Sequence, residues 1–448
     1  MKRWVRFWLA ISLVVALVAA VGYELFLHGE DPNYFKKEGL FLTYPGERPG
    51  SGQALPVGTV GELDLAYFGQ GASKGAVSPQ DEMRGVWLSY IELGPALKGK
   101  SEADAAAAIG EMFDQAKDLG LNTVVVQVRP FGDALYPSKV FPWSHILTGT
   151  QGTDPGYDPL AVMIRAAHDR GLAIHGWVNP FRVATGSATL SPENPAVKWA
   201  KDPETADYVK TLSNGTYYNP GYQAVRDLIV SGVKELVDGY DLDGIHMDDY
   251  FYPTTADEFD ALAYQKAKEA GSTLERDAWR LENVNLLVKA LYDTVHQGGK
   301  GTLFGISPQG NVDNNYKSQF ADVRTWCSQS GYIDYICPQI YYGYQNQTQP
   351  FDKVAEQWSA LVTSPDVQLI FGVTLHKLGK EDTYAGTGKD EWLSTDGIVA
   401  KQLATSKGTK GYHGFILYSY KFIFSPEAER KAQVENEVAK LREYLETN

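Results

Sequence analysis

Two adjacent carboxylates, Asp248 and Asp249, are the residues of this sequence best placed to do chemistry. They stand at the end of the strand candidate 243–248, and His246 lies two residues before Asp248, on the same face of an extended strand. Two carboxyl groups are costly to hold at a partly buried strand end unless they are used. We expect Asp248 to be the nucleophile or base and Asp249 the acid or a substrate clamp, with His246 hydrogen-bonded to Asp248 or to substrate. The alternative is that one aspartate only caps the loop.

Polar and aromatic side chains also follow the other strand candidates. Such a mixture can bind a sugar, because polar groups hydrogen-bond to its hydroxyls and flat rings stack on its faces. The alternative for Arg129 and Asp133 is an ion pair that only shapes the loop. The predicted substrate-binding residues are Arg129, Asp133, Trp177, Asn179, Arg182, His246, Gln309, Gln339, Tyr341, Tyr344 and His376.

The elements that must position these residues begin at Met83, where short β-branched runs alternate with amphipathic helical stretches. The strand candidates are 84–90, 122–128, 172–178, 243–248, 303–307, 332–340, 368–374 and 413–418. The helix candidates are 101–119, 158–170, 222–239, 275–297, 318–329, 352–362, 395–406 and 426–446. This count favours a (β/α)8 TIM barrel over an open doubly wound sheet, which typically has fewer strands and a glycine-rich turn after the first. Catalytic groups of such a barrel lie beyond the carboxyl ends of its strands.

Residues 1–28 have the pattern of an export segment, because Lys2, Arg3 and Arg6 precede an apolar run. The length of the run leaves open both a cleaved signal peptide and an uncleaved membrane anchor. Residues 29–82 are rich in Gly and Pro and are expected to form a linker or extension. We assign 83–425 to the barrel and 426–448 to its C-terminal helix. Basic flanks stay inside, which predicts an extracytoplasmic protein, anchored or secreted.

Composition narrows the function classes. Hydrophobic residues make up 44% of the 448 residues and charged residues 21%, which is typical of a globular chain. The net charge of -14 repels a phosphate backbone, so nucleic acid is not expected as a partner. Cys327 and Cys337 are expected to be free thiols and lack the spacing of a structural zinc site. A metal-dependent hydrolase with His175, His246 and Asp248 as ligands is an alternative, but the first strand has no His-x-His pair, so we expect no metal or cofactor.

Six strings in the chain resemble the glycosyl hydrolase-like 10 family of exported bacterial barrel proteins. They are RGVWLSY (84–90), NTVVVQVRPFGDALYPS (122–138), PWSHILTGTQGTDPGYDPL (142–160), RGLAIHGWVNPFRV (170–183), DGIHMDDYFYP (243–253) and DYICPQIYYGY (334–344). The resemblance implies a barrel related to the amylase-type barrels and a glycoside hydrolase acting outside the cytoplasm. Some family members act on peptidoglycan glycan strands stripped of stem peptides. The implied partners are such a glycan, the cell wall and, through the N-terminal segment, the membrane.

The amylase-type resemblance implies roles at the fourth and fifth strands. The nucleophilic Asp of those barrels ends a Gly-x-Arg-x-Asp pattern, which is matched here by GIHMD (244–248) with His in place of Arg. Their general-acid Glu follows the fifth strand, where this sequence has Gln309. The acid must then be another residue, with Asp249, Asp133 and Asp313 as candidates in that order. The missing Glu also leaves open a non-catalytic protein that binds cell-wall glycan.

Overall fold

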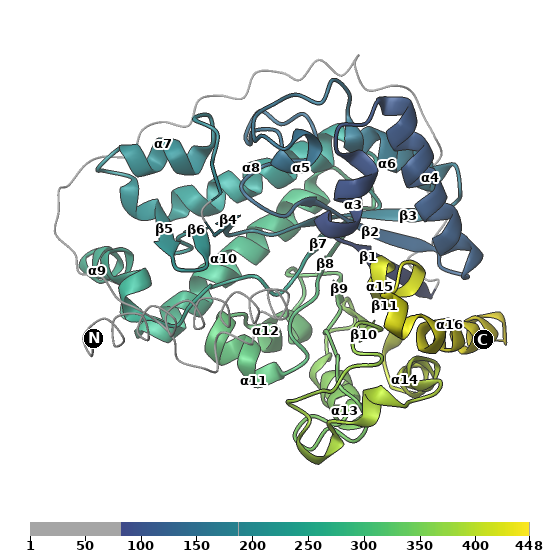
Figure 1. Cartoon of the computed structure of the whole chain (residues 1–448). Coiled ribbons are helices and arrows are strands. Elements are labelled where there is room, and N and C mark those ends of the chain that lie inside the picture. Colours follow the sequence, from purple (N-terminus) through teal and green to yellow (C-terminus); the bar gives the residue numbers. More distant parts are fainter. Residues whose placement is uncertain (1–81, 187, 448) are drawn as a thin grey trace, which may run out of the picture. The chain divides into compact units, whose positions relative to one another are not determined.

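The computed structural model describes residues 82–186 and 188–447. Parallel strands in this part of the chain close into a barrel in the order β1-β11-β10-β9-β8-β7-β3-β2 (Figure 1). They are β1 (Met83–Leu88), β2 (Thr123–Arg129), β3 (Ala173–Val178), β7 (Gly244–Met247), β8 (Leu303–Ile306), β9 (Tyr335–Ile336), β10 (Gln368–Thr374) and β11 (Tyr412–Tyr418). Each corresponds to one predicted strand, so the predicted (β/α)8 barrel is confirmed. β9 is shorter than predicted, because Pro338 has no N–H for the ladder and only isolated bridges follow at Gln339.

Helices follow the strands and surround the barrel. Those that match predicted helices are α4 (Glu102–Asp118), α6 (Pro159–His168), α8 (Gln223–Gly239), α10 (Arg276–Gln297), α12 (Val323–Ser328), α13 (Phe351–Leu361), α14 (Ile398–Lys407) and α16 (Lys431–Thr447). α12 begins later than predicted, because Phe320 adopts a left-handed φ of 53° and ends the preceding helical turn. α16 begins at Lys431 instead of 426, after a short 3-10 turn over Ala428–Arg430.

Shorter helices occupy loops in which none was predicted. They are α3 (Tyr90–Leu97), α5 (His145–Thr148), α7 (Pro195–Lys201), α9 (Ala261–Glu269), α11 (Val312–Asn314) and α15 (Tyr420–Phe424). Each lies in a segment that follows the carboxyl end of a strand. The loops that should carry the site are therefore built from ordered elements rather than from irregular chain.

A small antiparallel sheet is inserted between β3 and α8 and was not predicted. Its strands β4 (Arg182–Thr185), β5 (Val209–Leu212) and β6 (Gly215–Tyr218) have the order β4-β6-β5. Strands of four residues are too short to show a clear period-two pattern. The sheet matters for the site because its first residue, Arg182, pairs with Tyr217 of β6 and thereby has a fixed place.

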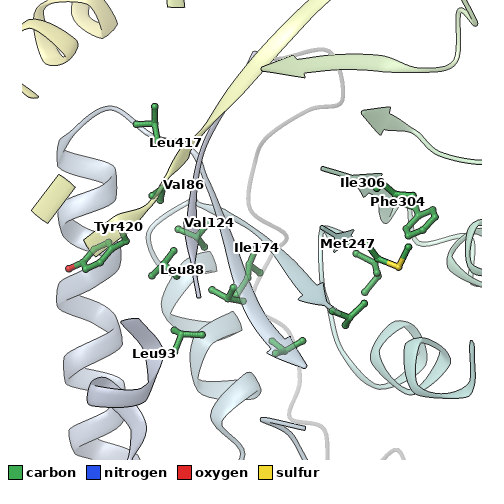
Figure 2. Close-up of a cluster of buried hydrophobic side chains, with 14 of the residues drawn as sticks. Val86, Leu88, Leu93, Val124, Ile174, Met247, Phe304, Ile306, Leu417 and Tyr420 are labelled. Atoms are coloured by element: carbon green, nitrogen blue, oxygen red, sulfur yellow. The ribbon is translucent and has the colours of Figure 1, made fainter. Parts of the chain in front are cut away.

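Outward-facing side chains of the strands pack against the surrounding helices. Figure 2 shows Val86 and Leu88 of β1 in one cluster with Val124 of β2, Ile174 of β3 and Leu93 of α3. Residues two apart on a strand share a face, so this apolar row leaves the alternate residues of each strand pointing into the barrel.

The barrel interior holds a second cluster of buried residues. It consists of Met83, Trp87, Val125, Trp177, Tyr335, Cys337, Ile370 and Ile416. Small residues make room for these large rings: a Cβ atom on Gly305 of β8 would overlap the ring of Tyr335. The interior is therefore filled by aromatic and aliphatic side chains, and only the layer above them is available for a site.

The first strand and the last helix of the described residues are tied together at the bottom of the barrel, the face formed by the amino ends of the strands. Arg84 Nη1 donates to the carbonyl oxygen of Leu445 in α16 at 3.0 Å. Glu437 of α16 accepts the backbone N–H groups of Gly397 and Val399 at 2.8 and 2.7 Å. α16 thus satisfies free donors at the start of α14 as well as binding β1.

Within the described residues, no helix combines the length and the apolar character needed to span a bilayer. The predicted export segment 1–28, and the predicted linker up to residue 81, lie outside the described residues. Cys327 in α12 and Cys337 after β9 are both buried and both free.

Candidate active site at the barrel mouth

Asp248 and Asp249 lie at the barrel mouth, which is the face formed by the carboxyl ends of the strands. β7 ends at Met247, so the pair occupies the first two positions of the following loop. Both residues are almost wholly buried, with exposed fractions of 2% and 4%. The strict alternation of faces that holds within a strand does not apply to them. The structure thus brings both predicted catalytic residues to the same mouth.

Asp248 accepts hydrogen bonds on both of its carboxyl oxygens. Trp177 Nε1 and Asn179 Nδ2 donate to Oδ2 at 3.1 and 3.0 Å. The backbone N–H of Tyr250 donates to Oδ1 at 3.1 Å. Trp177 and Asn179 come from the end of β3, which pairs directly with β7. The neighbouring strand therefore fixes the orientation of this carboxyl group.

Gln127 of β2 in turn orients Asn179. Its Nε2 donates to Asn179 Oδ1 at 2.8 Å, and its Oε1 accepts the backbone N–H of Tyr90 at 3.0 Å. Because the oxygen of Asn179 is engaged, its amide NH2 group must face Asp248. The sequence prediction did not single out Gln127, although a polar residue on the inward face of an apolar strand, two residues after Val125, was a usable signal.

Burial and the negative charge of Asp249 raise the pKa of Asp248 from its ordinary value of 3.8 to about 8. The positive charge of Arg182 and the hydrogen bonds from Tyr250 and Trp177 act in the opposite direction but do not cancel this rise. At neutral pH the two carboxyl groups therefore hold one proton between them. The pair offers a proton donor and a carboxylate side by side.

Asp249 faces the ends of β8 and β9. Gln339 Nε2 donates to the carbonyl oxygen of Ser307 at 2.9 Å and lies 3.5 Å from Asp249 Oδ1. Gln309 forms a backbone bridge with Gln339, and its own backbone N–H donates to Asn315 Oδ1 at 2.9 Å. Its buried side-chain nitrogen has no partner among the described residues. A neutral amide thus occupies the region in which the resemblance would place a general-acid Glu.

His246 lies in the layer below the acidic pair and has no solvent exposure. Trp87 Nε1 donates to its Nε2 at 3.1 Å, so Nε2 carries no proton and Nδ1 donates to the hydroxyl of Tyr335 at 2.8 Å. The same hydroxyl lies 2.9 Å from Nδ1 of His175. Both ring nitrogens of His246 therefore bind groups inside the barrel. The predicted hydrogen bond from His246 to Asp248 or to substrate is wrong.

The two interior histidines are neutral. Burial lowers the pKa of His175 to about 4, and burial together with His175 lowers the pKa of His246 well below its ordinary value. Across the part of the chain that the structure describes, no three His, Cys, Asp or Glu side chains are grouped as metal ligands would be. The alternative ligand set of His175, His246 and Asp248 is accordingly not assembled, since both imidazoles meet at Tyr335.

Arg129 does not point into the mouth. The pairing of β2 with β3 shifts between Gln127 and Arg129, and Arg129 is paired with the outward-facing Val178. Its guanidinium is wholly buried, with its central carbon 4.6 Å from the centre of the Phe141 ring, and burial lowers its pKa. The prediction that Arg129 binds substrate is therefore corrected, because the register shift turns the side chain away from the barrel interior.

Asp133 and Asp313 are also not placed to act on a substrate at the mouth. Asp133 is wholly buried and accepts a hydrogen bond from Gln151 Nε2 at 3.0 Å, with His145 Nδ1 at 2.9 Å. It forms no ion pair with Arg129 within the described residues, so the loop-shaping ion pair is not made either. Asp313 is exposed and paired with cationic side chains, which lower its pKa. Asp133 and Asp313 are therefore less well placed than Asp248 and Asp249 to act as the general acid.

Arg182, which was predicted to bind substrate, lies close enough to the acidic pair for its charge to lower the pKa of Asp248, and its contact with substrate stays a prediction. The guanidinium lies between the rings of Phe131 and Tyr250, at 4.9 and 4.4 Å from their centres. Its Nε donates to the carbonyl oxygen of Pro130 at 3.1 Å. Two rings and one carbonyl thus hold this cation in one orientation.

An aromatic wall faces the pair from β9, β10 and β11. Tyr341 stacks on Tyr418, with ring centres 5.4 Å apart, and meets the edge of His376 at 5.7 Å. The charges of Asp248 and Asp249 contribute, after burial, to raising the pKa of Tyr341. Tyr341 is therefore within electrostatic reach of the acidic pair, His376 packs against Tyr341, and both residues are half-buried.

Tyr344 lies farther out. Its ring packs on Phe351 of α13, its hydroxyl bonds Thr405 of α14 at 2.7 Å, and the Lys401 ammonium lies 4.0 Å from the ring centre. It lines a cavity of about 500 Å³ together with Lys401 and Glu391. This cavity belongs to the loops after β9 and β10 rather than to the surroundings of the acidic pair, so Tyr344 is separated from the other predicted residues.

The chain is similar to known proteins in sequence and in fold. A family model described as Glycosyl hydrolase-like 10 matches residues 82–386. The glycosyl hydrolase YngK of Bacillus subtilis (strain 168) is 40% identical over 352 residues, which cover 73% of this chain and 67% of that protein. The glycosyl hydrolase DigH of Escherichia coli (strain K12) is 30% identical over 387 residues, covering 78% and 85%.

Solved structures agree in fold alone. The glycoside hydrolase domain of PgaB from Bordetella bronchiseptica superposes with a TM-score of 0.51 at 14% identity, covering 79% of this chain and 98% of that one. The catalytic domain of the β-amylase of Paenibacillus polymyxa superposes with a TM-score of 0.52 at 12% identity, covering 81% and 99%.

Proposed function

Because the chain belongs to the glycosyl hydrolase-like 10 family, we propose that it hydrolyses glycosidic bonds of a polysaccharide outside the cytoplasm, with peptidoglycan glycan strands as its substrate. The Asp248–Asp249 pair at the barrel mouth is the observation that carries the proposal. Acid–base cleavage of a glycosidic bond needs one protonated and one ionised carboxyl group, and the pair supplies both at neutral pH. The relatives named as glycosyl hydrolases support the same reaction class.

Asp248 is assigned as the proton donor in this mechanism, because burial and the charge of Asp249 raise its pKa. The proton passes to the glycosidic oxygen while the bond from that oxygen to the anomeric carbon breaks, and the leaving sugar departs as an alcohol. The ionised Asp249 stabilises the positive charge that develops on the ring, and either bonds to the anomeric carbon or takes a proton from the attacking water. This assignment reverses the sequence-based expectation, in which Asp248 was the nucleophile or base.

The groups around the pair have positioning and binding roles. Trp177 and Asn179 hold the carboxyl group of Asp248 in one orientation, so its proton points in a fixed direction. The half-buried ring of Tyr341 offers a face for sugar stacking on the opposite side of the mouth. The proposal places the protein at the cell wall, exported through residues 1–28 as either a secreted or a membrane-anchored protein.

A glycan-binding protein without catalysis is the second candidate, favoured by Gln309 at the end of the fifth barrel strand. One experiment distinguishes hydrolysis from binding alone. It measures the release of reducing ends from purified peptide-free glycan strands. The wild type should release them, and Asp249→Asn should lower turnover by about 10³-fold or more, because it removes the charge that stabilises the transition state. Asp313→Asn, an exposed aspartate elsewhere, is the matched control and should retain turnover.

Two results would contradict catalysis by the acidic pair. A wild-type protein that binds the strands, as measured by co-sedimentation, but releases no reducing ends would show the binding function instead. Turnover by Asp249→Asn equal to that of Asp313→Asn would mean that the catalytic carboxylates lie elsewhere.

A further inference from the structure

The guanidinium of Arg182 has one hydrogen-bond acceptor among the described residues, and unlike the fully enclosed guanidinium of Arg129 it keeps some exposure at its terminal nitrogens. Its Nε donates to the carbonyl oxygen of Pro130, but its two terminal nitrogens have no acceptor among the described residues. The residue is 8% exposed, and neither terminal nitrogen is among the enclosed polar atoms that lack a partner. The terminal nitrogens therefore remain accessible to solvent.

Arg280 shows what a buried guanidinium normally requires. Its Nε and Nη2 donate to the two carboxyl oxygens of Asp260, each at 2.7 Å. Such a paired arrangement offsets the cost of removing both charges from water. Among the described residues, Arg182 forms no hydrogen bond or ion pair with an Asp or Glu carboxylate, although its charge acts on Asp248. Arg182 thus lacks a hydrogen-bonded carboxylate of the kind that Arg280 has, although its terminal nitrogens are accessible to one.

The surroundings of Arg182 fix where a partner would bind. The rings of Phe131 and Tyr250 lie against the guanidinium, so the in-plane edge that carries the terminal nitrogens is the free one. Tyr250 links this cation to the acidic pair, because its backbone N–H donates to Asp248 while its ring carries Arg182. A group bound to the free edge would therefore sit beside the bond that the pair cleaves.

We propose that Arg182 binds a carboxylate carried by a sugar of the substrate and thereby selects acidic glycans. The planar fork of a guanidinium matches the two oxygens of a carboxylate. This inference rests on the proposed function and deepens it. In a peptidoglycan strand the carboxylate belongs to the lactyl ether of the muramic acid, and it is free only where the stem peptide has been removed. A uronic acid carries the same chemical group.

The test compares two forms of one glycan. Peptide-free peptidoglycan strands are used as prepared and after carbodiimide activation and borohydride reduction, which converts each carboxylate to an alcohol. The ratio of kcat/KM on the two forms is measured for the wild type, Arg182→Gln, Arg182→Lys and Arg324→Gln. Arg324 is the matched control. It is an exposed arginine of α12 that, like Arg182, lies over a tyrosine ring, here that of Tyr316. Because each enzyme preparation is assayed on both forms of the glycan, the folded fraction of a variant cancels in the ratio.

The wild type and Arg324→Gln should prefer the carboxylated form by about 10- to 100-fold, the contribution of a charge-assisted hydrogen-bonded pair. Arg182→Gln should bring the ratio to about one, and Arg182→Lys should leave an intermediate ratio, because a lysine keeps the charge without the fork. A ratio in Arg182→Gln equal to that of the wild type would overturn the inference and leave the proposed function intact.

Binding separates a failure of this inference from a failure of the proposed function. If the wild type releases no reducing ends from either form, the proposed function fails. Titration calorimetry on the same two forms then decides the inference: a preference for the carboxylated form that is lost in Arg182→Gln supports it, and equal affinities overturn it. Titration with hyaluronan, which carries uronic acid, identifies the source of the carboxylate, since binding that depends on Arg182 would point to uronic acids rather than to muramic acid alone.

Discussion

Replacing Asp248 by Asn should stabilise the fold at neutral pH. The folded-state pKa of Asp248 is about 8, whereas its ordinary value of 3.8 applies to the unfolded chain. A carboxyl group whose pKa is raised by folding costs no stability below pH 4. It destabilises the fold progressively as the pH rises from about 4 to about 8. Asn has no proton to lose, so the variant escapes this cost.

The size of the effect follows from the contacts of Asp248. Between pH 4 and pH 7 the cost grows by about 1.4 kcal/mol per pH unit, which gives an upper value of about 4 kcal/mol at pH 7. An Asn oxygen can still accept from Trp177 and Asn179, but its NH2 group then faces the backbone N–H of Tyr250. The lost bond costs about 2 kcal/mol. The net change at pH 7 is a stabilisation of about 2 kcal/mol, with a destabilisation of similar size at pH 4.

Urea unfolding followed by tryptophan fluorescence, at several values between pH 4 and pH 8, measures the free-energy difference between variant and wild type. Asp313→Asn is the control of opposite sign, because cationic neighbours lower the pKa of Asp313 and its stabilising contribution is lost as the pH falls. The raised pKa and the placement of the proton on Asp248 would be refuted by either of two results. The free-energy difference between Asp248→Asn and the wild type would stay constant with pH, or the variant would become less stable than the wild type as the pH rises.

Trp177→Phe removes a hydrogen bond that lowers the pKa of Asp248, so the alkaline limb of the kcat/KM profile should move up by about one pH unit. Movement of the acid limb instead would make Asp248 the base. Gly305→Ala should lower the free energy of unfolding by about 3 kcal/mol, because the added methyl group overlaps the Tyr335 ring. Gly94→Ala has only ordinary contacts and is its control in thermal melts; equal melting temperatures of the two variants would contradict the packing argument.

The barrel strands and the acidic pair could be predicted because their signals are local. The segment over β2 is a run of β-branched residues flanked by a helix with a capping serine, and Ser101 indeed accepts the N–H of Asp104 at 3.2 Å. Asp248 and Asp249 stand out because two charges directly follow a buried strand. Burial and alternation along the chain are enough to place such features.

The contacts made by individual side chains could not be predicted, because they depend on residues distant in sequence. The direction of Arg129 is set by a register shift in the pairing of β2 with β3, which leaves no mark in the sequence. The partner of His246 is Tyr335, 89 residues later. The open edge of Arg182 depends on the rings of Phe131 and Tyr250, which come from two other loops.

The bond between Arg84 and the carbonyl of Leu445 leaves the start of the first strand and the end of the last helix side by side, on the face opposite the mouth. A protein fused directly to the start of β1 or to the end of α16 would therefore lie on the face opposite the mouth. In a chain shortened to residues 82–447, a short linker could join the start of β1 to the end of α16, with new ends opened in the exposed loop 298–301. The resulting circular permutant would keep the closed barrel and every contact of the acidic pair.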